Sequence, residues 1–274
     1  MSFPIENFIA KPGQKVALDK IDPKATSYQK GSSRDDVKKR LKELNERLEE
    51  LQNTLWAQKK HRVLLVLQAM DAGGKDGSIR KVFTGVNPAG VRVESFGRPS
   101  KAELSRDYLW RCHQVVPTDG EIVVFNRSHY EDVLAVRVLK LKPEEVWRKR
   151  YQHINDFERM LSDEGTTVVK VFLHISPAEQ KRRLQRRLDE PTKNWKFKSA
   201  DLEQRELWDK HQKAFAEAIS QTSTERAPWY VVPADNKWYR DVVLSEIMVQ
   251  TLESLNLVYP EPEEDLDGIK ISDI

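Results

Sequence analysis

Cysteine and long apolar runs are scarce in this 274-residue sequence, and each scarcity excludes a class of protein. Because Cys112 is the only cysteine, the chain cannot form an internal disulfide, and no cluster of histidine and cysteine marks it as a nucleophile. We expect Cys112 to be a small buried side chain. No apolar stretch approaches the ~20 residues of a membrane span, and the first residues lack the charged-then-apolar order of a secretory signal. The sequence therefore predicts a soluble cytoplasmic protein with no membrane partner.

A strong excess of one charge is also absent. The 46 basic and 43 acidic residues leave a net charge of +3, so the chain is not a polycation of the type that coats nucleic acid. Any anion-binding site must therefore be local. The length is sufficient for one large domain, or for a core with an inserted module.

The two ends differ in composition from the middle. Residues 1–33 are rich in Pro, Gly, Lys and Ser and predict an extended N-terminal arm, whereas residues 258–274 predict a loosely held acidic tail. Between them, residues 34–257 are expected to form the folded domain. This domain opens with leucines at helical spacing, from Leu41 to Leu55, which predict a charged amphipathic helix. We expect this helix to pack on its own domain, with a partner-binding role as the alternative.

Strand and helix patterns alternate through the domain. Apolar runs predict strands at 63–69, 91–96, 121–125, 167–175 and 229–233. Helices are expected from Ser78, over 101–115, from about Pro143, over 177–221 and over 238–256. Such alternation predicts an α/β fold, in which a parallel sheet is flanked by helices on both faces.

The segment AMDAGGKDG, between the first strand and the first helix of this series, suggests a phosphate-binding loop. A standard P-loop reads GxxxxGK[ST], in which backbone amides and a lysine surround phosphate oxygens and a hydroxyl holds magnesium. Here Ala69 replaces the first glycine and Asp76 replaces the hydroxyl, so the strict pattern fails. Gly73, Gly74 and Lys75 still supply a tight turn, close backbone approach and a positive charge at a helix start.

Charged residues around the loop extend this hypothesis. Asp71 adds a hard carboxylate oxygen of the type that Mg²⁺ binds, and we favour this role over the alternative of a turn cap. Arg80 and Lys81 follow in the helix, where cations oppose the helix dipole unless an anion lies nearby. We weigh phosphate binding and solvated surface charge equally for these two residues.

A second motif, IVVFNRSHYEDVLAVRV, also runs from a strand into a polar turn. In an open parallel sheet, ligands gather at the carboxyl ends of the strands, so we expect Arg127 and Lys75 to face the same crevice. Asn126 stands where P-loop kinases usually carry an aspartate. A metal would then depend on Asp71, with Asn126 offering a neutral oxygen and Glu131 a further carboxylate. Asn126 could also start the following helix as its cap, and Ser128 could serve as well.

With both motifs present, the chain resembles the polyphosphate kinase 2 family. The matching segments are MDAGGKDGSIRKVF, FGRPSKAELSRDYLWR, VVFNRSHYEDVLAVRV, RRLQRRLDEPTKNWKFKSADL and APWYVVPADNKWYRD, which together span about residues 30–257. The resemblance implies a three-layer αβα P-loop kinase fold similar to thymidylate kinase, a mobile lid, Mg²⁺, and phosphoryl exchange between inorganic polyphosphate and a nucleotide. It implies catalytic roles for Asp71, Lys75 and Arg127. Asn126, together with SHYEDV at 128–133, resembles the subgroup that phosphorylates both AMP and ADP.

The stretch EQKRRLQRRLDEPTKNWKFK is the expected lid, at about residues 178–205. Several of its cations share one helix face, and polyphosphate, which presents one negative charge after another, suits forked arginines on a closing lid. Arg183 and Arg187 are the first-choice polyphosphate ligands because they form one stripe. A solvated helix face and a nucleic-acid surface are the alternatives.

We therefore expect a polyphosphate kinase that converts AMP to ADP and ADP to ATP reversibly, without a covalent enzyme intermediate. Adenine nucleotides are the expected substrates, with guanine nucleotides as a further option, and a homo-oligomer, dimer or tetramer, is the expected assembly. The rival hypotheses are an ATP-dependent nucleoside monophosphate kinase and a non-catalytic nucleic-acid or polyanion binder. We expect no nucleic-acid partner, because a binder leaves the glycine loop and Asp71 without a purpose.

Overall fold

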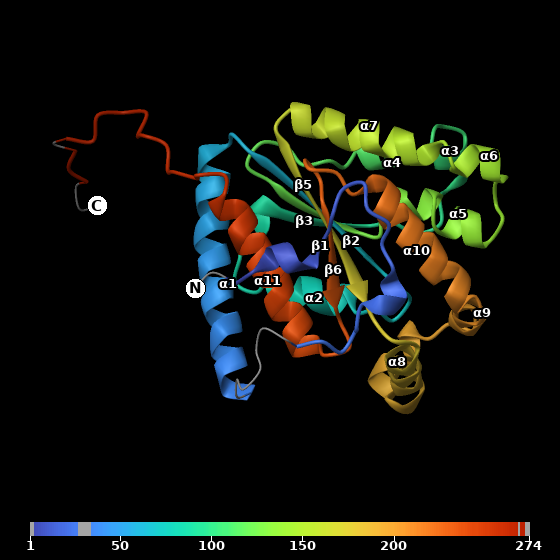
Figure 1. Ribbon diagram of the computed structural model, residues 1–274. Helices are drawn as coiled ribbons and strands as arrows, with labels where there is room; N and C mark the ends of the chain where they lie inside the picture. The colour runs from blue at the N-terminus through green and yellow to red at the C-terminus, as the bar shows by residue number, and fades with distance from the viewer. Residues whose placement is uncertain (1–2, 27–33, 268, 272–274) are drawn as a thin grey trace.

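The computed structural model describes residues 3–26, 34–267 and 269–271, and Figure 1 shows a central sheet between two groups of helices. In this described part, the sheet has six strands in the order β1-β6-β5-β2-β4-β3. The strands from β2 to β6 run parallel, and β1 pairs antiparallel with β6 at one edge. Their bounds are β1 Ile9–Ala10, β2 Arg62–Ala69, β3 Val91–Ser95, β4 Ile122–Asn126, β5 Thr166–His174 and β6 Trp229–Pro233. The predicted parallel sheet is confirmed.

The central strands are covered on both faces, which explains their unbroken apolar sequence. All side chains from Val63 to Leu67 in β2, and from Ile122 to Phe125 in β4, are fully buried. Each such side chain contributes roughly 1.5–3 kcal/mol when it leaves water. β2 and β4 are neighbours in the sheet, and because they run parallel, their carboxyl ends lie at the same edge.

Helices cover both faces of the sheet (Figure 1). On one face α1, α2 and α11 pack together, and on the other α7 and α10 pack with the short α5 beside them. Their bounds are α1 Arg34–Gln58, α2 Lys75–Val82, α5 Ala135–Val138, α7 Arg150–Asp163, α10 Trp208–Thr222 and α11 Lys237–Glu253. This arrangement is the predicted three-layer αβα fold.

The leucine-rich helix α1 packs on its own domain, as expected. Leu44, Leu48, Leu51 and Leu55 are buried, and α1 lies along α11. Its charged residues face outward, because the leucines recur at helical spacing and occupy one stripe.

The helix expected over 101–115 is broken in the structure. α3 covers Lys101–Leu104 and α4 covers Trp110–His113. Between them, Asp107 Oδ1 accepts a hydrogen bond from the backbone amide of Leu109 at 3.0 Å. An aspartate that bonds the backbone two residues ahead forms a turn in place of a helix, so it separates the two pieces.

The stretch 177–221 is also divided. Its first helix, α8, ends at Asp189 because Pro191 has no amide hydrogen and disfavours helical backbone at the residue before it. A 3₁₀ helix η6 and two α-helices follow. Their bounds are α8 Pro177–Asp189, η6 Pro191–Lys196 and α9 Ala200–Glu206, with α10 after them. Likewise, the helix expected from about Pro143 consists of α6 Glu144–Trp147 and then α7.

The described part of the predicted N-terminal arm, residues 3–26, packs against the body. It forms η1 Ile5–Phe8, β1 and η2 Leu18–Lys20, and it buries Phe8 and Leu18. The remainder of the predicted arm, 1–2 and 27–33, lies outside the described residues. At the other end, the described residues of the predicted acidic tail, 258–267 and 269–271, leave the body without helix or strand (Figure 1, red). Within the described chain, no helix has the length and apolarity needed to cross a membrane.

Candidate phosphate-binding active site

The glycine loop joins the carboxyl end of β2 to α2, which begins at Lys75, three residues earlier than expected. Gly74 precedes the helix with a left-handed φ of 102°. A Cβ on Gly74 would lie 2.2 Å from Arg240 Nη1, and one on Gly73 would lie 2.4 Å from the Cβ of Ala69. Both positions therefore require glycine, the first for its conformation and both for close approach. The first amides of α2 have no carbonyl partner within the helix and can bind an anion.

Lys75 places its ammonium group inside this turn. The side chain is 9 % exposed, and Nζ lies 3.5 Å from the carbonyl oxygen of Ala69. Burial, with a further contribution from the Arg127 charge, lowers the pKa of Lys75 to about 8. A buried ammonium group with one weak carbonyl contact is well suited to bind an anion.

The motif after β4 meets the glycine loop because β4 and β2 are adjacent and Asn126 lies opposite Leu67. The next residue, Arg127, has a left-handed φ of 62°, and its amide donates to Leu67 O at 3.1 Å. Its guanidinium donates to Asp71 Oδ1 at 2.8 Å. The expectation that Arg127 and Lys75 face one crevice is met, because both side chains line the same large cavity.

Asn126 and Asp76 form a second link between the two motifs. Asn126 Nδ2 donates to Asp76 Oδ1 at 2.9 Å. The alternative role of Asn126 as the cap of the following helix is not found in the structure. That role belongs to Ser128, whose hydroxyl accepts from the amide of Tyr130 at the start of η5 His129–Asp132. Burial alone would raise the pKa of Asp76, but the bond from Asn126 and the nearby Lys196 charge outweigh it and lower the pKa.

A cavity of about 1520 Å³ opens at this edge of the sheet. It exceeds the roughly 300–1,000 Å³ of a common small-molecule pocket, so it can hold two substrates. Ten of the predicted site residues line it: Asp71, Gly73, Gly74, Lys75, Arg80, Lys81, Asn126, Arg127, Arg183 and Arg187. The eleventh, Glu131, is not among the lining residues. Burial raises the pKa of Glu131, although the Arg127 and Lys75 charges oppose this.

The expected lid borders the cavity through α8 and η6. Arg187 donates to Asp201 Oδ2 at 2.9 Å, which ties α8 to the start of α9. Lys196 in η6 lies 3.7 Å from Asp76 Oδ2, so the lid reaches the glycine loop. Arg183 instead directs its guanidinium inward, onto loop carbonyls. Polyphosphate contacts by Arg183 and Arg187 remain predictions.

Sequence reasoning missed four lining residues in α11, namely Lys237, Trp238, Arg240 and Asp241. They follow β6, whose carboxyl end lies at the same edge of the sheet as the glycine loop. The rule that ligands gather at the carboxyl ends of parallel strands, applied to the segment ADNKWYRD, would have found them.

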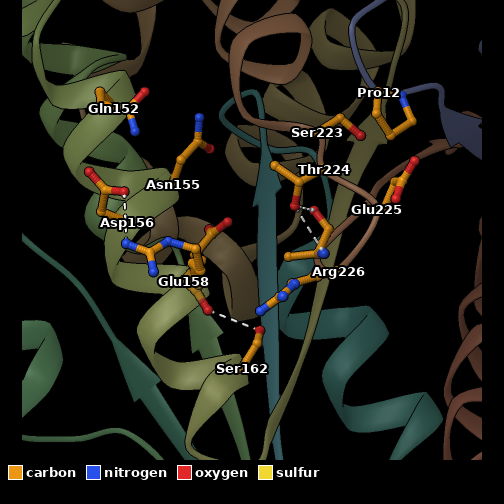
Figure 2. A pocket seen from close by; sticks show the side chains of 12 residues that line it. Pro12, Gln152, Asn155, Asp156, Glu158, Ser162, Ser223, Thr224, Glu225 and Arg226 are labelled. Carbon is orange, nitrogen blue, oxygen red and sulfur yellow. Dashed lines mark hydrogen bonds and ion pairs between the residues drawn. The ribbon is translucent and has the colours of Figure 1, made fainter.

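A smaller cavity of about 460 Å³ lies elsewhere and shares no lining residue with the first. Figure 2 shows Asn155 and Asp156 of α7 on one side of it and Thr224 and Glu225 on the other. Glu158 belongs to its wall, but the carboxylate of Glu158 is occupied by buried partners, including Lys170 Nζ at 2.5 Å. Two further charges at this cavity are paired within the protein, Asp156 with Arg159 and Arg226 with Asp163.

Magnesium fits the large cavity only as an ion that phosphate helps to bind. Among the described residues, no group of three His, Cys, Asp or Glu side chains could hold a metal ion. Mg²⁺ commonly uses one or two carboxylates and takes its other oxygens from water and substrate phosphates. Asp71 and Asp76 both line the cavity and supply carboxylates of this type. The residues therefore fit a metal that arrives with its substrate.

The parallel αβα fold, the glycine loop with its lysine at a helix start, and the strand-end arginine define a P-loop kinase type of protein. The chain belongs to the polyphosphate kinase 2 family, because the sequence model of that family matches residues 31–258.

Curated relatives and a solved structure match nearly the whole chain. An AMP/ADP-polyphosphate phosphotransferase of Meiothermus ruber is 57% identical over 267 residues, which are 97% of this chain and 100% of the relative. An ADP-polyphosphate phosphotransferase of Rhodopseudomonas palustris is 44% identical, over 95% of this chain and 94% of the relative. The crystal structure of polyphosphate kinase 2 from Arthrobacter aurescens TC1 superposes with a TM-score of 0.92 at 41% identity, covering 97% of this chain and 94% of that one.

Proposed function

We propose that the protein transfers phosphoryl groups between inorganic polyphosphate and nucleotides, converting AMP to ADP and ADP to ATP in a reversible reaction. The observation that carries this proposal is the cavity of about 1520 Å³ that holds Lys75, a buried ammonium group with only a carbonyl contact at 3.5 Å. Membership of the polyphosphate kinase 2 family supports the donor. The name of the Meiothermus ruber relative supports AMP and ADP as acceptors.

In this mechanism, the terminal oxygen of the acceptor nucleotide attacks the end phosphorus of polyphosphate in line, and the shortened polyphosphate leaves. The first amides of α2 and the ammonium group of Lys75 bind oxygens of the transferred group. Arg127 adds a second positive charge, and its bond to Asp71 sets the direction of its guanidinium. These groups stabilise the charge that develops in the transition state.

Mg²⁺ is part of the proposal. When bound, it would supply further neutralisation of phosphate charge. Asp71 is its expected ligand, because the carboxylate has a second oxygen beyond the one that accepts from Arg127. Asp76 offers another carboxylate at the same cavity, and Asn126 donates a hydrogen bond to it. Glu131 adds a buried negative charge that acts on Arg127 and Lys75.

The lid would exclude water, so that the acceptor nucleotide and not water takes the phosphoryl group. Arg187 on α8, together with Arg80 and Lys81 on α2, provides cations for a polyphosphate chain that extends beyond the glycine loop. The proposal also includes a cytoplasmic location, where AMP and ADP occur, and assembly as a dimer or tetramer.

The test incubates the purified protein with MgCl₂ and polyphosphate, with AMP or ADP added separately, and follows ADP and ATP by chromatography. Products from both acceptors support the proposal, whereas product from ADP alone would restrict it to one step. Reactions with GMP and GDP determine the base preference. Formation of ADP from AMP with ATP as donor, and none with polyphosphate, would identify an ATP-dependent nucleoside monophosphate kinase instead. Omitting MgCl₂ and adding a chelator should abolish the reaction.

A further inference from the structure

Arg183 of α8 points away from solvent and into the back of the glycine loop. Its Nη1 donates to the carbonyl oxygens of Ala72 at 3.1 Å and Gly73 at 2.7 Å. Its Nη2 donates to the carbonyl oxygen of Ala234 at 2.5 Å, after β6, and its Nε donates to Glu179 at 2.6 Å. The side chain is only 7% exposed. One guanidinium therefore joins the glycine loop, α8 and the connection between β6 and α11.

The loop carbonyls that Arg183 binds determine where the loop amides point. A trans peptide is planar, so its C=O and its N–H point in opposite directions. The carbonyl of Ala72 shares a peptide with the amide of Gly73, and that amide donates to Met70 O at 2.9 Å. The carbonyl of Gly73 shares a peptide with the amide of Gly74, which must therefore point away from the guanidinium.

Glycine at position 74 allows this arrangement. A Cβ there would lie 3.2 Å from Arg183 Nη1, in a backbone conformation with a φ of 102° that other residues rarely adopt. Gly74 is also the residue before α2, so its amide is next to the unpaired donors of the first helical turn. This amide is a donor that a bound phosphate would use.

We propose that Arg183 is a positioning residue that fixes the Gly73–Gly74 peptide in the orientation required for phosphate binding. The inference rests on the proposed function, because it takes phosphate as the ligand of the loop. It gives Arg183 a role different from the one expected from the charge stripe of α8. Although the side chain borders the cavity, four hydrogen bonds of its guanidinium are to backbone carbonyls. The arginine acts on phosphate through the backbone.

Substitutions separate positioning from direct phosphate binding. Arg183→Lys keeps the positive charge but loses the planar fork that contacts several carbonyls, whereas Arg183→Gln loses both. A direct phosphate ligand would be largely preserved by lysine, but a positioning fork would not. Arg182→Gln is the matched control, because Arg182 is adjacent, pairs with the same Glu179, is 59% exposed and does not line the cavity.

The orientation of the peptide can be observed directly by NMR. The chain contains 11 glycines, and only Gly73 and Gly74 are consecutive. In full-length protein labelled with [1-¹³C,¹⁵N]glycine, an HNCO experiment gives a single cross-peak, which joins the Gly73 carbonyl to the Gly74 amide. We expect Arg183→Lys and Arg183→Gln to move this cross-peak in the ligand-free protein, and Arg182→Gln to leave it in place. The amide resonances of the other glycines report whether each variant is folded, and if Arg183→Gln disturbs them, the lysine variant decides.

Kinetics supplies the second readout. Because the loop amides act in the transition state, we expect both Arg183 variants to lower kcat by about tenfold or more while the KM for polyphosphate changes less than about twofold. An unmoved cross-peak in both variants would overturn the proposal. It would also be overturned if Arg183→Lys kept a near-normal kcat and only Arg183→Gln raised the KM for polyphosphate, because that result indicates a direct phosphate ligand. If the wild-type protein transferred no phosphate from polyphosphate, the proposed function would fail, yet the ligand-free cross-peaks would still decide whether Arg183 orients this peptide.

Discussion

Two buried lysines in this protein have opposite surroundings. Lys170, in the middle of β5, is fully buried, and its ammonium group contacts Glu158 at 2.5 Å and the carbonyl oxygen of Thr222 at 2.6 Å. Lys75, in the glycine loop, is nearly as buried but has a single carbonyl contact, to Ala69 at 3.5 Å. Among the described residues, it forms no ion pair. Lys170 is in direct contact with a carboxylate, whereas the carboxylates near Lys75 act on it only from a distance.

The difference separates a structural cation from a binding cation. Burial lowers the pKa of Lys170, and the Glu158 carboxylate opposes that effect. His129 and Tyr130 also contact Glu158, so the buried group is satisfied without any ligand. Desolvation of a charge is costly unless partners offset it. Nearby carboxylates favour the charged form of Lys75, but its ammonium group has no direct anionic partner until a ligand binds, and its position in the cavity therefore indicates an anion-binding role.

The largest expected effect is on stability. Replacing Lys170 by Met leaves the Glu158 carboxylate buried without its cation, and we expect the free energy of unfolding to fall by about 3–5 kcal/mol. Urea denaturation measures this change. Lys75→Met is the matched variant and should alter the unfolding free energy by less than about 1 kcal/mol, because no carboxylate loses a hydrogen-bonded cation and the buried Glu131 keeps the Arg127 charge beside it. Equal losses in the two variants would contradict the comparison. Adding Glu158→Gln to Lys170→Met should recover part of the loss.

Enzyme activity should fall more when Lys75 is replaced than when Lys170 is replaced. Lys75→Ala removes a charge that is expected to stabilise the transferred phosphoryl group, so kcat should fall by about 10²–10³-fold. The melting temperature should stay close to that of the wild type. Initial rates of ATP formation from ADP and polyphosphate give the measurement. Near-normal turnover in Lys75→Ala would remove this residue from the mechanism. The folded fraction of Lys170→Met should retain turnover within about tenfold, since Lys170 does not touch the cavity.

The lowered pKa of Lys75 predicts a pH dependence. With a pKa of about 8, Lys75 is charged at neutral pH and loses its proton as the pH rises through that value. The kcat/KM of the wild-type enzyme should therefore decline above about pH 8, approaching tenfold per pH unit. Bound phosphate favours the charged form, so the decline in kcat should begin at higher pH. Lys75→Arg stays charged throughout this range and should lose the decline near pH 8. Persistence of the same decline in that variant would assign it to another group.

Local patterns were sufficient to predict much of this arrangement. The apolar runs of β2 and β4 reflect strands buried on both faces, and the parallel alternation then placed Lys75 and Arg127 at one edge. The orientation of Arg183 was beyond the sequence, because helical spacing shows which residues share a face but not which backbone that face meets. Arg240 could have been placed at this edge, because it follows β6. Its contact with Gly74 could not, because that depends on how α11 packs beside α2 in the folded chain.

The smallest expected effect is that of replacing a third lysine. Lys196, on the lid, pairs with Asp76 at 3.7 Å, but both side chains are partly exposed. A solvent-exposed pair contributes only about 0.2–1 kcal/mol, so Lys196→Met should raise the KM for polyphosphate by no more than about fivefold. A double-mutant cycle with Asp76→Asn measures the coupling, and the amide keeps an oxygen that can accept from Asn126. A coupling energy within that range that weakens in high salt would show that Lys196 forms an exposed ion pair. Lys196 would then differ from Lys170, which is paired and buried, and from Lys75, which is buried without a direct anionic partner. Zero coupling together with a large rise in KM would show that Lys196, like Lys75, directs its charge to the substrate.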